Sequence, residues 1–233
     1  MKKFIINCLV IFLISTPLYA DKLLKSGFLS GEWKLNTNFE VKEPKNKILI
    51  IYNHGQDDHD KASKNCVWKN NIRNIASLSG KKVKDKVVLV YSFCTDHLGG
   101  DDWKRLWKKK FDFPYKGITK LDKRVNANLK LIDNFLEKGV PKNQIILTGH
   151  SCGGWMIMML MAKYPDKVGG GISLMQACYG KLSKKMKVKK VGIEKALEKF
   201  RKKEGDGPAD LRIKQINEIK QSNNLPVLVF THP

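Results

Sequence analysis

Three short, unbroken apolar runs constrain the fold of this chain more than any other feature of its sequence. They span residues 47–53, 87–93 and 144–148 and are rich in Ile, Leu and Val. A strand with one solvated face alternates polar and apolar residues, so a continuous apolar run predicts a strand buried on both faces. Such strands occur in parallel sheets that helices cover on both sides. The runs therefore predict an α/β fold.

Helical patterns between and after these runs support the same fold. Residues 119–138 carry apolar side chains at helical spacing, and the pattern stops at Gly139 before Pro141. Residues 28–41 predict a hairpin or two short edge strands. Further helices are predicted at 68–78 and 153–164, and further strands at 168–176 and 225–231. Because strands alternate with helices, we expect a mostly parallel sheet with helices on both faces.

Residues 181–224 interrupt this alternation. Eleven basic residues lie between positions 181 and 203, where only Glu194 and Glu198 are acidic. A Gly-Asp-Gly-Pro sequence at 205–208 separates this stretch from a second amphipathic one. We interpret the segment as a helical insertion or a cap over the carboxyl ends of the strands. Its charge is either a solvated face or an attraction for anionic substrates or surfaces.

Size and charge restrict the class of protein. A chain of 233 residues, 42% of them apolar, is enough for one globular domain with a sizeable core. The formal net charge of +22 is compatible with a polyanion-binding surface. Only five of the 44 basic residues are arginine, the preferred residue for bidentate phosphate and base recognition, and the lysines are spread along the chain. We therefore expect no specific nucleic-acid partner.

The first twenty residues have the pattern of a secretory signal peptide. A basic start at residues 1–3 precedes an apolar run at 4–14 and a small residue, Ala20, at the expected cleavage site. The run is shorter than the about 20 residues that a membrane-spanning helix needs. An uncleaved N-terminal anchor is the alternative. We expect residues 1–20 to be removed and residues 21–233 to form an exported domain, periplasmic or extracellular, without a transmembrane span.

Four cysteines remain after removal of the leader, at Cys66, Cys94, Cys152 and Cys178. An even number of cysteines in an oxidising compartment predicts disulfides, and four cysteines allow three pairings. None of the spacings is Cys-x-x-Cys, and the cysteines lie far apart in the sequence. We therefore predict no metal site.

The pentapeptide Gly149-His150-Ser151-Cys152-Gly153 lies between a predicted strand and a predicted helix. This is the G-x-S-x-G pattern of a nucleophile elbow, a sharp turn that projects the serine above the sheet. Small residues two positions before and after the serine relieve the crowding of that turn. The N-terminus of the following helix favours developing negative charge. Ser151 is therefore the predicted catalytic nucleophile.

A His-Gly pair follows the first buried strand, at His54 and Gly55. In a sheet with a nucleophile elbow, this loop supplies one backbone N–H of the oxyanion hole, and the residue after the nucleophile supplies the other. We assign one donor to Cys152 and leave the other open between Gly55 and Gln56. The histidines His54 and His150 are predicted to contact the substrate.

These features resemble the α/β-hydrolase superfamily, particularly its dienelactone-hydrolase-like and small esterase members. The strand ending in His54-Gly55, the long helix at 119–138 and the elbow GHSCGGW carry the resemblance, which covers roughly residues 28–180. It implies a serine ester hydrolase. Ser151 would attack the ester-type carbonyl of a small-molecule substrate and form an acyl-enzyme that water releases. No cofactor is predicted.

The resemblance also suggests a disulfide pairing. In this fold, the strands that end near Cys152 and Cys178 are neighbours, which favours a bridge between these two cysteines beside the active site. The remaining bridge would join Cys66 to Cys94, near the ends of the two earlier strands.

The sequence departs from the superfamily where the acid and the histidine of the triad are expected. In that family the acid follows the second strand after the elbow, and the histidine comes later. Here that strand is 225–231, and the last residue is Pro233. Three explanations are open: a fragment that lacks the last strand, acid and base, an inactive homologue that binds without cleaving, or a rearranged triad that uses His54, His97 or His232. We expect the first, an incomplete hydrolase domain.

Overall fold

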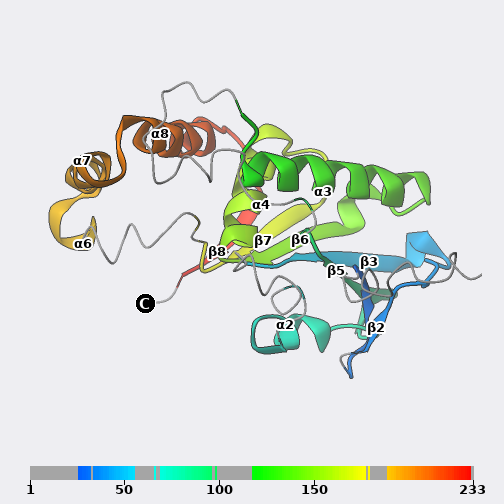
Figure 1. The fold of residues 1–233 in the computed structure, drawn as a ribbon. Coiled ribbons are helices and arrows are strands. Elements are labelled where there is room, and N and C mark those ends of the chain that lie inside the picture. The colour runs from blue at the N-terminus through cyan, green and yellow to red at the C-terminus, as the bar shows by residue number, and fades with distance from the viewer. Residues whose placement is uncertain are drawn as a thin grey trace, which may run out of the picture.

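The computed structural model describes residues 26–32, 34–55, 66, 69–95, 98, 117–176, 178 and 188–231. Within these residues, an eight-stranded sheet forms the centre of the fold (Figure 1). The predicted leader at residues 1–20 lies outside the described residues, as do Gln56, His97 and His232. The interpretations that depend on these residues stay predictions.

The strands follow the order β2-β1-β5-β3-β6-β7-β8, and β4 pairs with β5. Their bounds are β1 Gly27–Leu29, β2 Leu35–Asn36, β3 Lys47–Asn53, β4 Lys82–Val83, β5 Lys86–Phe93, β6 Ile145–His150, β7 Gly170–Leu174 and β8 Val227–Phe230. The strands β5, β3, β6, β7 and β8 run parallel to one another, whereas β1, β2 and β4 pair antiparallel. The predicted mostly parallel sheet is confirmed, and the predicted hairpin corresponds to β1 and β2.

Helices lie on both faces of this sheet. Their bounds are α2 Lys69–Ala76, α3 Lys120–Glu137, α4 Cys152–Lys163, α6 Val188–Val191, α7 Ile193–Glu204 and α8 Asp206–Lys220, with the short 3-10 helices η2 Pro44–Asn46 and η5 Lys142–Gln144. Figure 1 shows α2 on one face and α3 and α4 on the other. None of the helices in the described part of the chain is long and apolar enough to cross a membrane.

Alternate residues of the central strand β3 contribute to two separate cores. Leu49 and Ile51 belong to the core that includes residues of α3 and α4, whereas Ile50 and Tyr52 belong to the core that includes residues of α2. All four side chains are buried. Successive side chains of a strand point to opposite faces. A strand covered on both sides must therefore be apolar without interruption, as the sequence of β3 is.

Helix α3 begins and ends at signals that are visible in the sequence. The Thr119 Oγ1 accepts a hydrogen bond from the Asp122 N–H at 3.1 Å, and the Asp122 carboxylate accepts one from the Thr119 N–H at 3.3 Å. This reciprocal pair is a capping box. After the helix, Gly139 has a φ of 85°, a left-handed conformation that favours glycine. Residues next to each end of α3 thus determine where the helix begins and ends.

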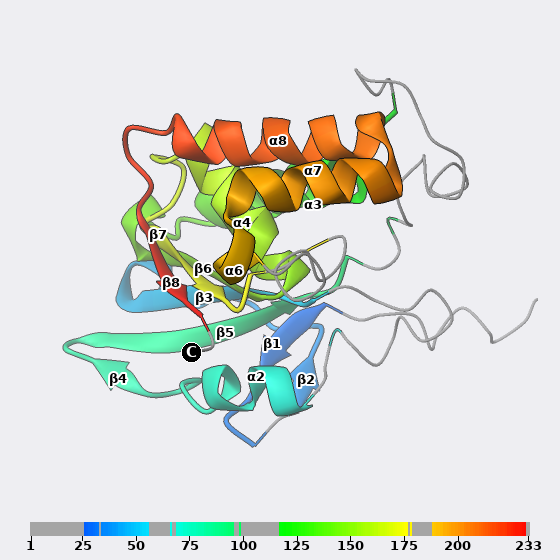
Figure 2. The same ribbon diagram turned by 90° about the vertical axis from the view of Figure 1, so that its left-hand side faces the viewer.

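Residues 188–220 form the predicted helical insertion. Helix α8 packs against α4, and α7 packs against α8 (Figure 2). The guanidinium of Arg212 in α8 lies 4.9 Å from the centre of the Trp155 ring in α4. Between the two insertion helices, Arg201 forms an ion pair with Asp210. The insertion is therefore attached to the helical layer on one face of the sheet through α4.

We expect Leu49→Ala to lower the free energy of unfolding by about 2–5 kcal/mol, because Leu49 is fully buried in β3 and its truncation leaves a cavity. The matched control is Leu228→Ala in β8, whose side chain is 63% exposed. This variant should change the free energy by no more than about 0.5 kcal/mol. Urea unfolding followed by circular dichroism measures both variants. Equal losses would contradict the burial described above.

Candidate active site

Ser151 occupies a sharp turn between β6 and α4. Its backbone has φ 54° and ψ −117°, and a positive φ is costly for a residue with a side chain. The Ser151 N–H donates to the Leu174 carbonyl of β7 at 3.0 Å, and the Ser151 carbonyl accepts from the Trp155 N–H of α4 at 3.0 Å. The strained turn is thus held by the neighbouring strand and by the following helix. This is the arrangement of a nucleophile elbow.

Three glycines around Ser151 allow backbone segments to approach closely. A Cβ at Gly149 would lie 2.6 Å from the Gly153 carbonyl carbon, and a Cβ at Gly153 would lie 2.2 Å from the Asn53 carbonyl oxygen. A Cβ at Gly154 would lie 2.8 Å from a side-chain oxygen of β7. Real Cβ atoms essentially never come within 3.0 Å of another heavy atom in this way. Close packing therefore requires glycine at these positions, which is the reason for the spacing of the motif.

The loop after β3 lies beside this turn. β3 and β6 are parallel neighbours, with Asn53 opposite Gly149. A Cβ at Gly55 would lie 3.4 Å from the Ser151 Cβ and 3.5 Å from the His150 Nδ1. The structure therefore brings the predicted oxyanion loop next to the predicted nucleophile.

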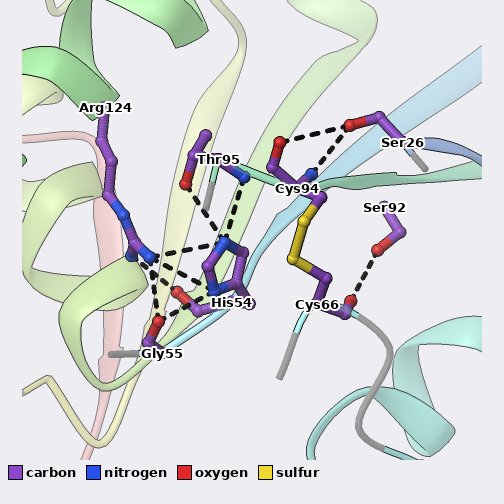
Figure 3. Close-up of a disulfide and its surroundings, with 8 residues drawn as sticks. All are labelled: Ser26, His54, Gly55, Cys66, Ser92, Cys94, Thr95 and Arg124. Atoms are coloured by element: carbon purple, nitrogen blue, oxygen red, sulfur yellow. Dashed lines mark hydrogen bonds between the residues drawn. A yellow bond between two sulfur atoms is a disulfide. The ribbon is translucent and has the colours of Figure 1, made fainter. Parts of the chain in front are cut away.

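The imidazole of His54 is buried, and its side chain is only 1% exposed. The Thr95 N–H donates to the His54 Nε2 at 3.1 Å, and the His54 Nδ1 lies 2.9 Å from the Gly55 carbonyl oxygen (Figure 3). A backbone N–H can only donate, so this arrangement fits the tautomer with its proton on Nδ1. Burial leaves the ring almost no surface for a substrate. Its contacts indicate that the ring holds the loop, and the substrate contact predicted for His54 stays a prediction.

Arg124 of α3 reaches the same loop from the opposite side. Its side chain is 1% exposed, and its guanidinium donates to the His54 carbonyl at 2.9 Å and to the Gly55 carbonyl at 3.0 Å. One turn later, the Asn128 side chain donates to the Asn53 Oδ1 at 2.9 Å. The sequence analysis did not identify these two residues. Their positions could have identified them, because Arg124 and Asn128 lie four residues apart on the apolar face of the predicted helix. Charged and amide side chains are rarely buried on such a face unless they have specific partners.

His150 precedes the nucleophile and is partly buried. Burial lowers the pKa of its imidazole below the usual value of 6.5, because the charged form loses hydration. The ring is therefore mainly uncharged at neutral pH. The substrate contact predicted for His150 stays a prediction.

Two disulfides flank the site. Cys152, directly after Ser151, is bonded to Cys178 with a Cα–Cα distance of 4.5 Å. Cys66 is bonded to Cys94, at the end of β5, with a Cα–Cα distance of 5.1 Å. These are the two pairs that the sequence analysis favoured.

One group of potential metal ligands occurs among the described residues. Ligand atoms of His54, Cys66 and Cys94 all lie within 4.8 Å of one another. The two sulfur atoms are bonded to each other in the structure, so neither is a thiolate, the form that binds metals. In its disulfide form, this group is therefore not a metal site.

The sequence of this chain is similar to a known protein family over most of its length. A family model described as phospholipase/carboxylesterase matches residues 36–202. None of the curated proteins that were compared matches the chain.

Several solved structures are similar to the chain at low sequence identity. A hyperthermophilic esterase from the archaeon Pyrobaculum calidifontis is 18% identical, with a TM-score of 0.43, over 81% of this chain and 57% of its own. A phospholipase/carboxylesterase from Dyadobacter fermentans is 12% identical, with a TM-score of 0.41, over 90% of this chain and 87% of its own. The S-formylglutathione hydrolase of Staphylococcus aureus is 15% identical, with a TM-score of 0.32, over 83% of this chain and 67% of its own. The chain thus spans a little over half the length of the Pyrobaculum esterase, 57%.

Gly153→Ala should destabilise the protein by at least about 2 kcal/mol, because overpacking of a closely packed site typically costs about 1–3 kcal/mol and the new Cβ would meet backbone 2.2 Å away. Gly31→Ala is the matched control. Its Cβ would come no closer than 3.5 Å to another heavy atom, and we expect a change within about 0.5 kcal/mol. Thermal and urea unfolding measure both. A tolerated Gly153→Ala would show that the elbow is packed less closely than described.

Replacement of both Cys66 and Cys94 by serine should lower the free energy of unfolding by about 3–4 kcal/mol. The bridge spans 28 residues, and its loss releases chain entropy in the unfolded state. Chemical unfolding without reductant compares the variant with the wild type, and a peptide map of the wild type confirms that the bridge is present. A loss below about 1 kcal/mol would contradict a stabilising bridge between these positions.

Proposed function

Because the chain belongs to the phospholipase/carboxylesterase family, we propose that it is an exported serine hydrolase that cleaves carboxylic esters through an acyl-enzyme on Ser151. The observation that carries this proposal is the strained backbone of Ser151, at φ 54°, in the turn between β6 and α4 and beside Gly55. A protein that used this serine only for folding would not need it in a costly conformation.

The proposed reaction has two stages. The Ser151 Oγ attacks the carbonyl carbon of the ester while a general base takes its proton, and the carbonyl oxygen becomes an oxyanion. The intermediate then expels the alcohol, which takes up a proton, and leaves the acyl group on Ser151. Water attacks the acyl-enzyme in the same way and releases the carboxylic acid. Each stage forms one C–O bond and breaks another.

The oxyanion would be stabilised by backbone N–H groups from two elements. Cys152 is the first residue of α4, where the N–H groups point out of the helix and the helix dipole is positive. The loop after β3 would provide the second donor, from Gly55 or Gln56. Preorganised donors of this kind are worth about 100–1,000-fold in rate each.

The first step needs a general base that takes the proton of the Ser151 Oγ. Histidine is the commonest base in such reactions. His97 and His232, two of the candidates from the sequence, lie outside the described residues. The third candidate, His54, has its Nε2 occupied by the Thr95 N–H, which argues against a role as the base.

The proposal also includes export of the protein and a small-molecule ester as its substrate. The leader pattern at residues 1–20 supports export, and the two disulfides fit an oxidising compartment. The family description supports a small-molecule ester as the substrate.

Ser151→Ala should abolish both hydrolysis of p-nitrophenyl acetate and labelling by a fluorophosphonate probe, because the nucleophilic oxygen is lost. Ser77→Ala, at an exposed serine after α2, should keep both properties. The two assays are performed on folded protein verified by circular dichroism. A folded, full-length wild type that neither hydrolyses esters nor reacts with the probe would contradict the proposal and favour a binding protein on the same scaffold.

A further inference from the structure

Arg124 is a charged side chain in an apolar environment. It is 1% exposed and is the largest of the fully buried side chains in the described residues. Burial of a guanidinium costs several kcal/mol unless its N–H groups have good acceptors. Burying an arginine on the apolar face of α3 therefore costs free energy, and its hydrogen-bond partners indicate its role.

Arg124 donates hydrogen bonds to two consecutive carbonyl groups of the loop beside Ser151. The Nη1 donates to the His54 carbonyl at 2.9 Å, and the Nη2 donates to the Gly55 carbonyl at 3.0 Å (Figure 3). Arginine is suited to this role because its planar group offers donors in a fixed fork, whereas lysine offers a single point charge.

These two bonds orient the N–H groups of the loop. In a trans peptide unit, the carbonyl and the following N–H lie in one plane and point in opposite directions. When Arg124 holds the His54 carbonyl, the Gly55 N–H must point away from the guanidinium. The same covalent geometry links the Gly55 carbonyl to the next N–H. Both candidates for the second oxyanion donor therefore belong to peptide units whose carbonyls Arg124 holds.

The other contacts of the loop resist its rotation. The His54 ring is held by the Thr95 N–H, which follows the Cys66–Cys94 bridge, and by the Gly55 carbonyl. The Arg124 Nη2 also lies 3.3 Å from the His54 Nε2, the ring nitrogen without a proton. The loop is thus fixed between α3 and the end of β5. A positive group on the carbonyls also polarises both peptide units and makes their N–H groups better donors.

We propose that Arg124 is a positioning residue of the esterase: it holds the His54 and Gly55 carbonyls so that the loop N–H groups face the oxyanion that forms at Ser151. The inference rests on the proposed function. Arg124 acts through the loop and touches no reacting atom.

Arg124→Ala should lower kcat by about 10–100-fold, because misplaced catalytic groups typically cost about that much, and it should leave KM within about threefold of the wild type. Arg124→Lys should recover only part of kcat, since one ammonium cannot bond two carbonyls in a fork. Guanidinium ion added at millimolar concentration should partly restore kcat of Arg124→Ala but not of the wild type. An unchanged kcat, or a raised KM with an unchanged kcat, would overturn the inference.

The matched control is Ile132→Ala, a fully buried position on the same helix whose aliphatic side chain cannot hydrogen-bond to the loop. It should lose stability yet keep kcat at a temperature where it is folded. If it lost kcat as much as Arg124→Ala, the effect would be general destabilisation, and the inference would fail. If Arg124→Ala does not fold, Arg124→Lys and Arg124→Gln are compared with the same control.

Amide hydrogen exchange separates this inference from the proposed function. Exchange at residues 53–56 should be faster in Arg124→Ala than in the wild type and unchanged in Ile132→Ala. Unchanged exchange in Arg124→Ala would overturn the positioning role whatever the activity. An inactive, unlabelled wild type in which the variant still accelerates exchange would instead contradict the proposed function and leave Arg124 as the residue that fixes the loop.

Discussion

The close approach of Gly153 to the end of β3 determines how the site is assembled. A Cβ at Gly153 would lie 2.2 Å from the Asn53 carbonyl oxygen and 2.6 Å from that of His54, so only glycine allows α4 to start where it does. Because α4 starts there, the chain must reverse at Ser151 with a positive φ. The same approach brings Gly55 beside Ser151. One steric condition thus links the nucleophile, the helix N-terminus and the predicted oxyanion loop.

A loop held this closely needs partners for its own backbone. Irregular backbone that is buried must find donors and acceptors outside secondary structure. Here Arg124 supplies donors to two carbonyls, and the Thr95 N–H donates to the His54 ring. Thr95 in turn directly follows Cys94, which the bridge to Cys66 holds in place. The hydrogen bonds to the His54 and Gly55 carbonyls therefore offset the free-energy cost of burying the guanidinium, and they hold the loop after β3 in place.

The sequence predicted the strands and helices well, because each is defined by a local pattern. The run at 47–53 coincides with β3, and the helix predicted at 119–138 corresponds to α3, Lys120–Glu137. The elbow was also predictable, since its glycines have a steric cause within five residues. The role of Arg124 could not be predicted, because the carbonyl groups to which it donates are 70 and 69 residues away in the sequence. For the same reason the contacts of His54 with Thr95 and Arg124 were not predicted.

Two of the five arginines of this lysine-rich chain have a shared structural use. Arg124 donates to the carbonyls of His54 and Gly55, and Arg212 donates to the Cys178 carbonyl while it packs over Trp155. Both are buried, and both join a helix to irregular backbone beside a disulfide. A planar group with several fixed donors can satisfy such carbonyls, whereas a lysine ammonium is more strongly hydrated and less directional. Arg124 and Arg212 are thus used where the backbone near Ser151 is held in one orientation.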